Sequence, residues 1–270
     1  MELFTWRQHM GELDERYERG QETRRMFGGG QITGGSSPGA WELAPDLERI
    51  LGEMLFGTIW KRPALTPVQR EMITLSCLIV MNREVQLKRH LGNALNIGLT
   101  PNQIVELIIH DTWYGGAPAG IQALTLCKEV FEERETDFTP VRVHDTSEDS
   151  DGLFRRGMEF RRHYVGNIPR TPAPEHTQAE RDLNRITGEY YWGATWTRPG
   201  LDLTSRSICS MTCLAVIGRE ERLELHIRGA LNIGLTPDQI IEVFGHMTLY
   251  AGIQLARDAM EVANDIFASL

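Results

Sequence analysis

The segment Ala94–Pro101 reads ALNIGLTP, and the same eight residues return at Ala230–Pro237. Working outward from this pair, a shift of 136 residues aligns Leu65–Gly116 with Leu201–Gly252 without a gap, and 24 of the 52 aligned residues are identical. Solenoid proteins repeat a unit of about 20 to 50 residues, whereas this period is the length of a whole domain. The sequence therefore contains one domain twice.

Each copy of the repeat reads as a set of helices. Thr66 and Pro67 are an N-cap followed by proline at the first helical position, which predicts a helix from there to about residue 82. A second helix is predicted over residues 83–97, with Gly98 as its left-handed end. The segment Thr100–Gln103 is a capping box that opens a third helix, and the second copy repeats it. No segment alternates apolar and polar residues for long, so the predicted fold class is all-α.

The loops suggest the domain borders. We expect a first domain at residues 1–135, a linker at 136–151 and a second domain at 152–270. The first domain includes an N-terminal extension and the Gly/Ser-rich segment 28–40, which is predicted to be a mobile loop. The segment 166–176 holds three prolines and is predicted to be extended.

Composition restricts the partners of the protein. The chain has 270 residues, of which 41% are hydrophobic, and 28 basic against 37 acidic residues give a net charge of -9. This balance argues against nucleic acid, because phosphate binding needs a basic surface. The longest apolar run, 72–81, is too short to cross a bilayer, and four cysteines in so long a chain do not make a disulfide scaffold. We expect a cytoplasmic protein with reduced thiols and no membrane partner.

The ordered polar residues of the repeat resemble those of a known family. The first copy carries Arg70, Glu84, His90, the ALNIG and Thr-Pro motifs, Glu106, His110 and Tyr114-Gly-Gly-Ala-Pro. The second copy matches through Arg206, Glu220, His226, Glu242, His246, Tyr250 and Gly252. This series resembles the carboxymuconolactone decarboxylase family, whose all-helical superfamily includes the AhpD-type alkylhydroperoxidases. The resemblance implies two tandem AhpD-like helical domains related by an internal pseudo-two-fold axis.

The resemblance also separates two kinds of chemistry. The resemblance implies that the peroxidase branch carries a Cys-x-x-Cys-x-x-x-His relay. In this chain, Arg83 and Gln86 occupy the two cysteine positions before His90, and two arginines occupy them before His226. A peroxide-reducing pair needs one thiolate to attack and a second to resolve. The sequence is therefore similar to the decarboxylase branch, in which a lactone acid loses CO2 without metal or organic cofactor. We accordingly expect neither cofactor nor metal.

Histidine is the best acid or base available for this chemistry, because it titrates near neutral pH. We predict His90 and His226 as catalytic residues, with Glu84 and Glu220, six residues before them, as their orienting partners. Six residues is not a same-face spacing on a helix, so each pair meets only if the helix begins between its members or the glutamate comes from another unit. The alternative is that each histidine is a buried structural residue.

The substrate-binding prediction rests on faces of other helices. Glu106, His110 and Tyr114 recur at i, i+4 and i+8, as do Glu242, His246 and Tyr250, so each set shares one helix face. Arg70 and Arg206 either bind a substrate carboxylate or pair with a glutamate. Trp60 and Trp196 either cover an apolar substrate or belong to the core. Glu71 occupies a position where the peroxidase branch has a relay carboxylate, while the second copy has Ser207.

These observations lead to one functional hypothesis with alternatives. The leading one is a cofactor-independent decarboxylase, or related lyase, that acts on a cyclic lactone or β-keto-type carboxylic acid and uses histidine as proton donor. A hydrolase or isomerase acting on a related lactone is the first alternative, and a non-catalytic ligand-binding protein or a weak thiol peroxidase is another. The partners expected are a small-molecule acid and further copies of the chain, as a dimer or trimer.

Overall fold

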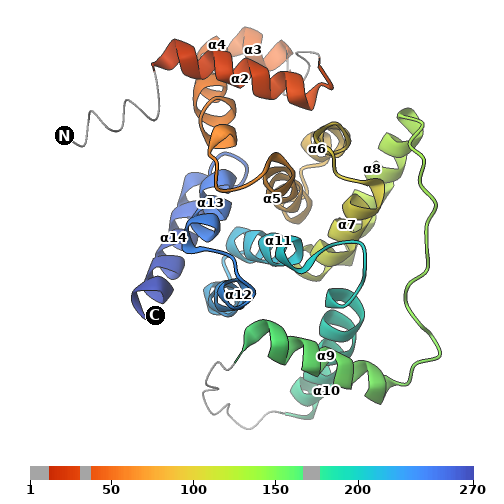
Figure 1. The fold of residues 1–270 in the computed structure, drawn as a ribbon. Coiled ribbons are helices and arrows are strands. Elements are labelled where there is room, and N and C mark those ends of the chain that lie inside the picture. The colour runs from red at the N-terminus through yellow and green to blue at the C-terminus, as the bar shows by residue number, and fades with distance from the viewer. Residues whose placement is uncertain (1–11, 31–37, 167–176) are drawn as a thin grey trace.

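The computed structural model describes residues 12–30, 38–166 and 177–270, and helices are its only regular elements in these ranges apart from one isolated bridge. The first half contains α2 (Leu13–Phe27), α3 (Pro38–Leu43), α4 (Pro45–Leu51), η1 (Gly52–Phe56), η2 (Ile59–Lys61), α5 (Pro67–Val80), α6 (Glu84–Ile97), α7 (Pro101–Gly115) and α8 (Ala117–Glu133). The second half contains α9 (Ser150–Val165), α10 (Gln178–Ile186), η3 (Thr187–Trp196), α11 (Leu203–Val216), α12 (Glu220–Asn232), α13 (Pro237–Met247) and α14 (Ile253–Ala268). The predicted all-α class with two tandem domains is confirmed (Figure 1).

Local sequence explains where these helices begin and end. The hydroxyl of Thr100 accepts from the backbone N–H of Gln103, whose side chain accepts from the backbone N–H of Thr100, and the same reciprocal box opens α5 and α13. Gly98 ends α6 with φ +109°, a left-handed conformation that glycine adopts without a Cβ clash. The predicted bounds of α5 and α6 hold to within two residues.

The structure differs from the loop predictions at two places. Pro38–Leu43 forms α3, so the last residues of the predicted mobile loop 28–40 are helical, and residues 31–37 lie outside the described part of the chain. The helix α9 begins at Ser150, inside the predicted linker 136–151, because the side chain of Asp149 accepts from the backbone N–H of Gly152 and caps it. Of the predicted extended segment 166–176, only Gly166 is described.

The two halves pack through matched helices. The helices α5 and α11 lie against each other near the middle of the molecule, and α7 of the first half packs on α11 as α13 of the second half packs on α5 (Figure 1). This reciprocity fits a pseudo-two-fold relation between the halves. Because α5 and α11 each pack against the other half, side chains from α5 belong to the core of the second half, and Cys209 of α11 belongs to the core of the first half.

Two glycines let the first helix of each half approach its partner closely. A Cβ on Gly20 of α2 would lie 2.2 Å from the carbonyl oxygen of Gly52, and one on Gly157 of α9 would lie 2.0 Å from that of Gly188. Only glycine fits at such an approach. The contact brings the C-terminal ends of α2 and α9, with Phe27 and Tyr164, against the centre of the molecule.

The interface between the halves also buries a carboxyl group. Asp111 of α7 is fully buried, and its carboxyl group lies beside the side chains of Ser76 and Cys213. Burial raises its pKa from 3.8 to about 7, although the polar groups of Ser76, Cys213 and Arg206 oppose the shift. The matched residue of the second half is Met247, so the repeat does not require a carboxyl here.

The raised pKa of Asp111 predicts a stability change with pH. The folded chain keeps this proton up to about pH 7 whereas the unfolded chain loses it near pH 4, so the stabilisation is complete in acid and is lost as the pH rises through 7. We expect the wild-type free energy of unfolding to fall by about 1 kcal/mol between pH 6 and pH 9 for this reason, and Asp111→Asn to remove that fall. Thermal melts at both pH values measure it, with Asp258→Asn on the exposed face of α14 as control. An equal pH dependence in wild type and Asp111→Asn would contradict the prediction.

Candidate functional site

The predicted histidines, tyrosines and tryptophans gather in two centres, each built from both halves. The His90 centre consists of Trp60, Glu71, Thr74, His90, His246 and Tyr250. The His226 centre consists of His110, Tyr114, Tyr164, Tyr191, Trp196, Ser207, Ser210 and His226. The polar face of α7 therefore lies beside the histidine of α12, whereas His246 of α13 and Tyr250, in the turn after α13 ends at Met247, lie beside the histidine of α6. The predicted helix face of Glu242, His246 and Tyr250 thus ends before Tyr250.

The His90 centre contains a buried histidine–carboxylate pair. Glu71 of α5 is fully buried, and its Oε1 lies 2.8 Å from Nδ1 of His90. A carboxylate can only accept, so Nδ1 carries a proton and donates to Glu71. The other ring nitrogen, Nε2, has no hydrogen-bond partner among the described residues, and the histidine side chain is 11% exposed. The pair thus orients an imidazole whose Nε2 is available to a ligand.

Residues of the second half complete the wall beside this pair. Tyr250 lies edge-on to His90, with ring centroids 5.7 Å apart, and its hydroxyl accepts from Nε1 of Trp60 at 3.0 Å. Burial, with the charge of Glu71, raises the pKa of Tyr250, so this phenol keeps its proton. His246 contacts Thr74 through Nε2 at 3.0 Å, and burial, with the charges of Arg70 and His90, lowers its pKa. His246 is therefore neutral, and the wall offers hydroxyl and imidazole groups without negative charge.

The His226 centre is a closed network of hydroxyl groups. Tyr164 and Tyr191 each place a hydroxyl 3.3 Å from a ring nitrogen of His226, at Nδ1 and Nε2 respectively. The hydroxyl of Tyr114 lies 2.6 Å from both that of Tyr191 and Oγ of Ser210. His226 is only 4% exposed, and burial, with Arg222 and Arg161, lowers its pKa to about 3. This histidine is neutral and fully hydrogen-bonded.

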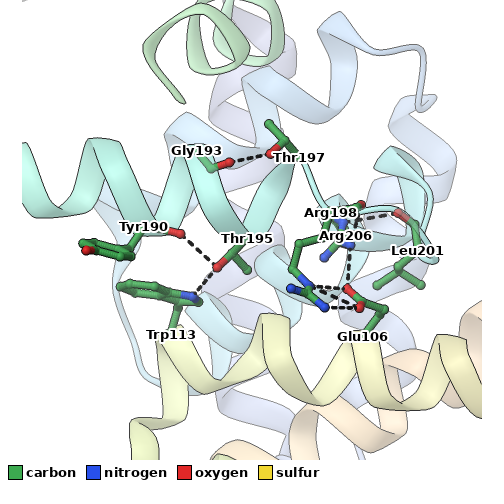
Figure 2. A network of polar contacts seen from close by, with 9 residues as sticks. All are labelled: Glu106, Trp113, Tyr190, Gly193, Thr195, Thr197, Arg198, Leu201 and Arg206. Carbon is green, nitrogen blue, oxygen red and sulfur yellow. Dashed lines mark hydrogen bonds and ion pairs between the residues drawn. The ribbon is translucent and has the colours of Figure 1, made fainter. Parts of the chain in front are cut away.

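Two buried ion-pair networks lie next to the centres and join the halves. Glu106 of α7 accepts from Nη2 and Nε of Arg198 at 2.7 and 2.9 Å and from Nη2 of Arg206 at 3.2 Å (Figure 2). On the other side, Glu242 accepts from Nη2 of Arg70 at 2.8 Å and also pairs with Arg62.

These pairs bear on the arginines predicted to bind substrate. Arg70 and Arg206 are fully buried, and each also donates to a backbone carbonyl. Burial lowers the pKa of both, opposed by the paired glutamate. Of the two interpretations open from the sequence, the geometry favours pairing with glutamate over binding of a substrate carboxylate. The same holds for Glu106 and Glu242, which are the partners.

Glu84 and Glu220 lie away from the histidines they were predicted to orient. Each is the first residue of its helix and is exposed, whereas His90 and His226 are buried. Six residues turn a helix by about 600°, which places glutamate and histidine on different faces. An acidic residue in the first turn stabilises the helix dipole, which accounts for the glutamates. The pairing predicted from Glu84 is therefore made by Glu71 instead.

The tryptophans lie inside the centres rather than at their rims. Trp60 is 4% exposed and contacts the His246 ring edge-on at 4.8 Å, and Trp196 is 2% exposed and lies over His226 with centroids 5.6 Å apart. Both form part of the aromatic wall and of the core.

A groove of about 570 Å³ opens beside the His90 centre, along α6 and α8. Lys88, Arg89 and Arg134 line it together with Glu84 and the ring of Phe27. Phe27 also lies edge-on to His90, with centroids 6.0 Å apart. The ring of Phe27 thus contacts both the groove and the histidine.

The sequence did not single out Tyr164 and Tyr191 as site residues. The signal that could have found Tyr191 is the repeat itself, because the matched first-half residue is Leu55 and a phenol replaces an aliphatic side chain there. No group of three or more His, Cys, Asp or Glu in the described ranges could hold a metal ion. Among the same residues, no helix is long and apolar enough to cross a membrane.

Comparisons with known proteins agree with the repeat. The model of the carboxymuconolactone decarboxylase family matches residues 45–129 and again residues 181–265, which together make up more than half of the chain. The chain is 31% identical over 118 residues to the 4-carboxymuconolactone decarboxylase of Acinetobacter baylyi, covering 43% of this chain and 88% of that protein. It is 38% identical over 117 residues to the nitrosuccinic acid decarboxylase of Metarhizium robertsii, covering 41% of this chain and 78% of that protein. With two matched copies of the family domain, the chain belongs to the carboxymuconolactone decarboxylase family.

Proposed function

We propose that the chain is a decarboxylase that acts on a small cyclic lactone acid or β-keto-type acid, and that the His90 centre carries the reaction. The observation that supports this most is the pair of Glu71 and His90, which orients the imidazole and leaves Nε2 without a hydrogen-bond partner in the described part of the chain. Two relatives at 31% and 38% identity are named as decarboxylases of a lactone acid and of a nitro acid. Both names describe the loss of CO2 from a small carboxylic acid.

The chemistry requires an electron acceptor in the substrate and a proton donor in the protein. The bond between the carboxylate carbon and its neighbour breaks, CO2 leaves, and the electron pair moves into the conjugated carbonyl or lactone. Protonated His90 then delivers a proton from Nε2 to the carbon that lost CO2, and solvent returns the proton to the histidine. The phenol of Tyr250, which keeps its proton, donates to the developing enolate oxygen.

The surroundings favour this step. The rings of Phe27 and Tyr250 lie edge-on to His90, and Trp60 packs against Phe27. A carboxylate transferred from water to such an aromatic wall is destabilised relative to neutral CO2. The groove beside Phe27 offers room for a small acid, with the cations of Lys88 and Arg89 on its wall. We propose that substrate approaches from this groove when the Phe27 ring moves aside.

The test is incubation of the full chain with a series of lactone acids and β-keto acids while CO2 and product are followed. Release of one CO2 per substrate supports the proposal. Ring-opened or rearranged product without CO2 would support a hydrolase or isomerase, which would use Nε2 of His90 as a general base. Binding without turnover would leave a ligand-binding protein.

The cysteines are not expected to take part. All four are buried, and burial raises the pKa of Cys77, Cys127, Cys209 and Cys213, so none is poised as a thiolate. We predict that Cys77→Ala and Cys213→Ala each leave turnover within about tenfold of wild type. Steady-state assays with and without hydrogen peroxide check this, and peroxide-dependent turnover that disappears in either variant would support the thiol peroxidase alternative.

A further inference from the structure

The two centres use matched positions of the repeat, and four of these positions differ. The first half has Phe27, Leu55, Glu71 and Asn93 where the second half has Tyr164, Tyr191, Ser207 and Gly229. The match of Phe27 with Tyr164 is shown by their surroundings. The side-chain amide of Asn96 donates to the backbone carbonyl of Phe27, and that of Asn232, at the equivalent position, donates to the carbonyl of Tyr164.

The hydroxyl of Tyr164 occupies the place that a carboxylate takes in the first half. It lies 2.8 Å from Oγ of Ser207 and 3.3 Å from Nδ1 of His226. In the first half, Oε1 of Glu71 lies 2.8 Å from Nδ1 of His90. Ser207 is shorter than the matched Glu71, and Tyr164 is longer than the matched Phe27. The histidine of the second half therefore has a neutral hydroxyl as its Nδ1 partner, where that of the first half has a charged carboxylate.

The third difference makes room for this tyrosine. A Cβ on Gly229 would lie 2.6 Å from the ring of Tyr164, so a side chain such as that of Asn93 cannot coexist with the ring at this place. Tyr164 itself is fully buried. The substitutions at 164, 207 and 229 therefore fit one another.

The fourth difference gives the remaining ring nitrogen of His226 a hydrogen-bond partner. The hydroxyl of Tyr191 lies 3.3 Å from Nε2 of His226, whereas the matched Leu55 has no polar atom to offer. Both nitrogens of His226 therefore have a partner, whereas Nε2 of His90 has none among the residues that the structure describes.

From these contacts we infer that Tyr164 and Tyr191 together close the His226 centre to substrate, so that each chain has one working centre, the one around His90. This inference rests on the proposed function, since it states which of the two centres carries it. Tyr191 occupies Nε2, the nitrogen that carries the proposed chemistry in His90, and Tyr164 replaces the carboxylate at Nδ1. The hydroxyl groups of the second half are then structural contacts between α9, η3, α11 and α12.

A first experiment follows the histidine ring by NMR and does not depend on turnover. In wild type, the side-chain signals of His226, assigned by His226→Asn, should not move between pH 5.5 and pH 8. In Tyr164→Phe with Ser207→Glu, which installs the first-half residues, they should titrate within that range. Titration of His226 in wild type, or none in the folded double variant, would overturn the inference.

A single variant keeps the inference testable if the double variant does not fold. Tyr164→Phe removes only the hydroxyl, and the Nδ1 chemical shift of His226 should then change while the signals of His90 remain in place. An unchanged Nδ1 shift would show that the phenol is not the partner of this nitrogen and would overturn the inference.

A second experiment places the exchange in a chain whose first centre is disabled. Adding Tyr164→Phe, Tyr191→Leu and Ser207→Glu to His90→Asn should raise turnover at least tenfold over His90→Asn alone, and His226→Asn should remove the gain. A folded variant in which His226 titrates but no turnover is recovered would contradict the assignment of the two tyrosines. If wild type turns over no acid at all, the proposed function fails, and the NMR result still decides whether the second centre is closed.

Discussion

Replacing His90 by Asn should lower decarboxylation turnover by about 10²–10⁴, the usual contribution of a general acid or base. Asparagine keeps a polar side chain of similar size but cannot carry a proton to carbon at neutral pH. The thermal melting temperature should change little, since the asparagine amide can replace Nδ1 of His90 as the hydrogen-bond donor to the buried Glu71. Steady-state turnover and thermal melts of the same preparations measure the two effects.

His163→Asn is the matched control for this experiment, because the side chain of that histidine is exposed on α9. It should leave turnover unchanged. Full activity in His90→Asn would remove this histidine from the mechanism, and loss of activity in step with melting temperature would make its role structural.

Replacing Glu106 by Gln should destabilise the fold by about 3–5 kcal/mol, the range seen when one partner of a buried ion pair is removed. The variant leaves the guanidinium groups of Arg198 and Arg206 without their counter-charge, and Arg206 is only 1% exposed (Figure 2). Because these ion pairs join α7 of the first half to the second half, we expect the lost stability to come from a weaker contact between the halves. A decrease in melting temperature of roughly 10 °C is expected for a chain of this size.

Glu224→Gln provides the matched control, since Glu224 pairs with Arg228 four residues later on the partly exposed face of α12. Exposed pairs of this kind contribute under about 1 kcal/mol. Equal melting temperatures for Glu106→Gln and Glu224→Gln would show that the buried network does not stabilise the interface. Chemical denaturation of both variants gives the free energies directly.

Local patterns made the elements predictable. Capping boxes such as that at Thr100 and Gln103, proline after an N-cap and the left-handed Gly98 act within a few residues, so the sequence alone locates the ends of α5 to α7. The faces were predictable for the same reason: 3.6 residues per turn place Glu106, His110 and Tyr114 together, and the structure directs all three toward the second half. The repeat predicted that any such feature occurs twice.

Partners across the molecule were not predictable in this way. The sequence suggested Glu84 for His90 because of proximity along the chain, but helical rotation separates them, and packing of α5 on α6 supplies Glu71 from 19 residues away. Whether the buried arginines bind a substrate carboxylate or pair with a glutamate was likewise open from the sequence. Their glutamates lie 100 and 172 residues away, and only the crossing of α7 and α13 between the halves brings them within reach.

The sequence by itself thus determined the all-helical class, the duplication, the helix faces and the two histidines, because propensity, capping and periodicity are local. Tertiary structure alone decided that α7 serves His226 and α13 serves His90, and that phenols bind both nitrogens of one histidine while a carboxylate binds one nitrogen of the other. These contacts depend on how closely helices approach, as at Gly229 against Tyr164. Such distances follow from the packing of many side chains at once, which no single stretch of sequence contains.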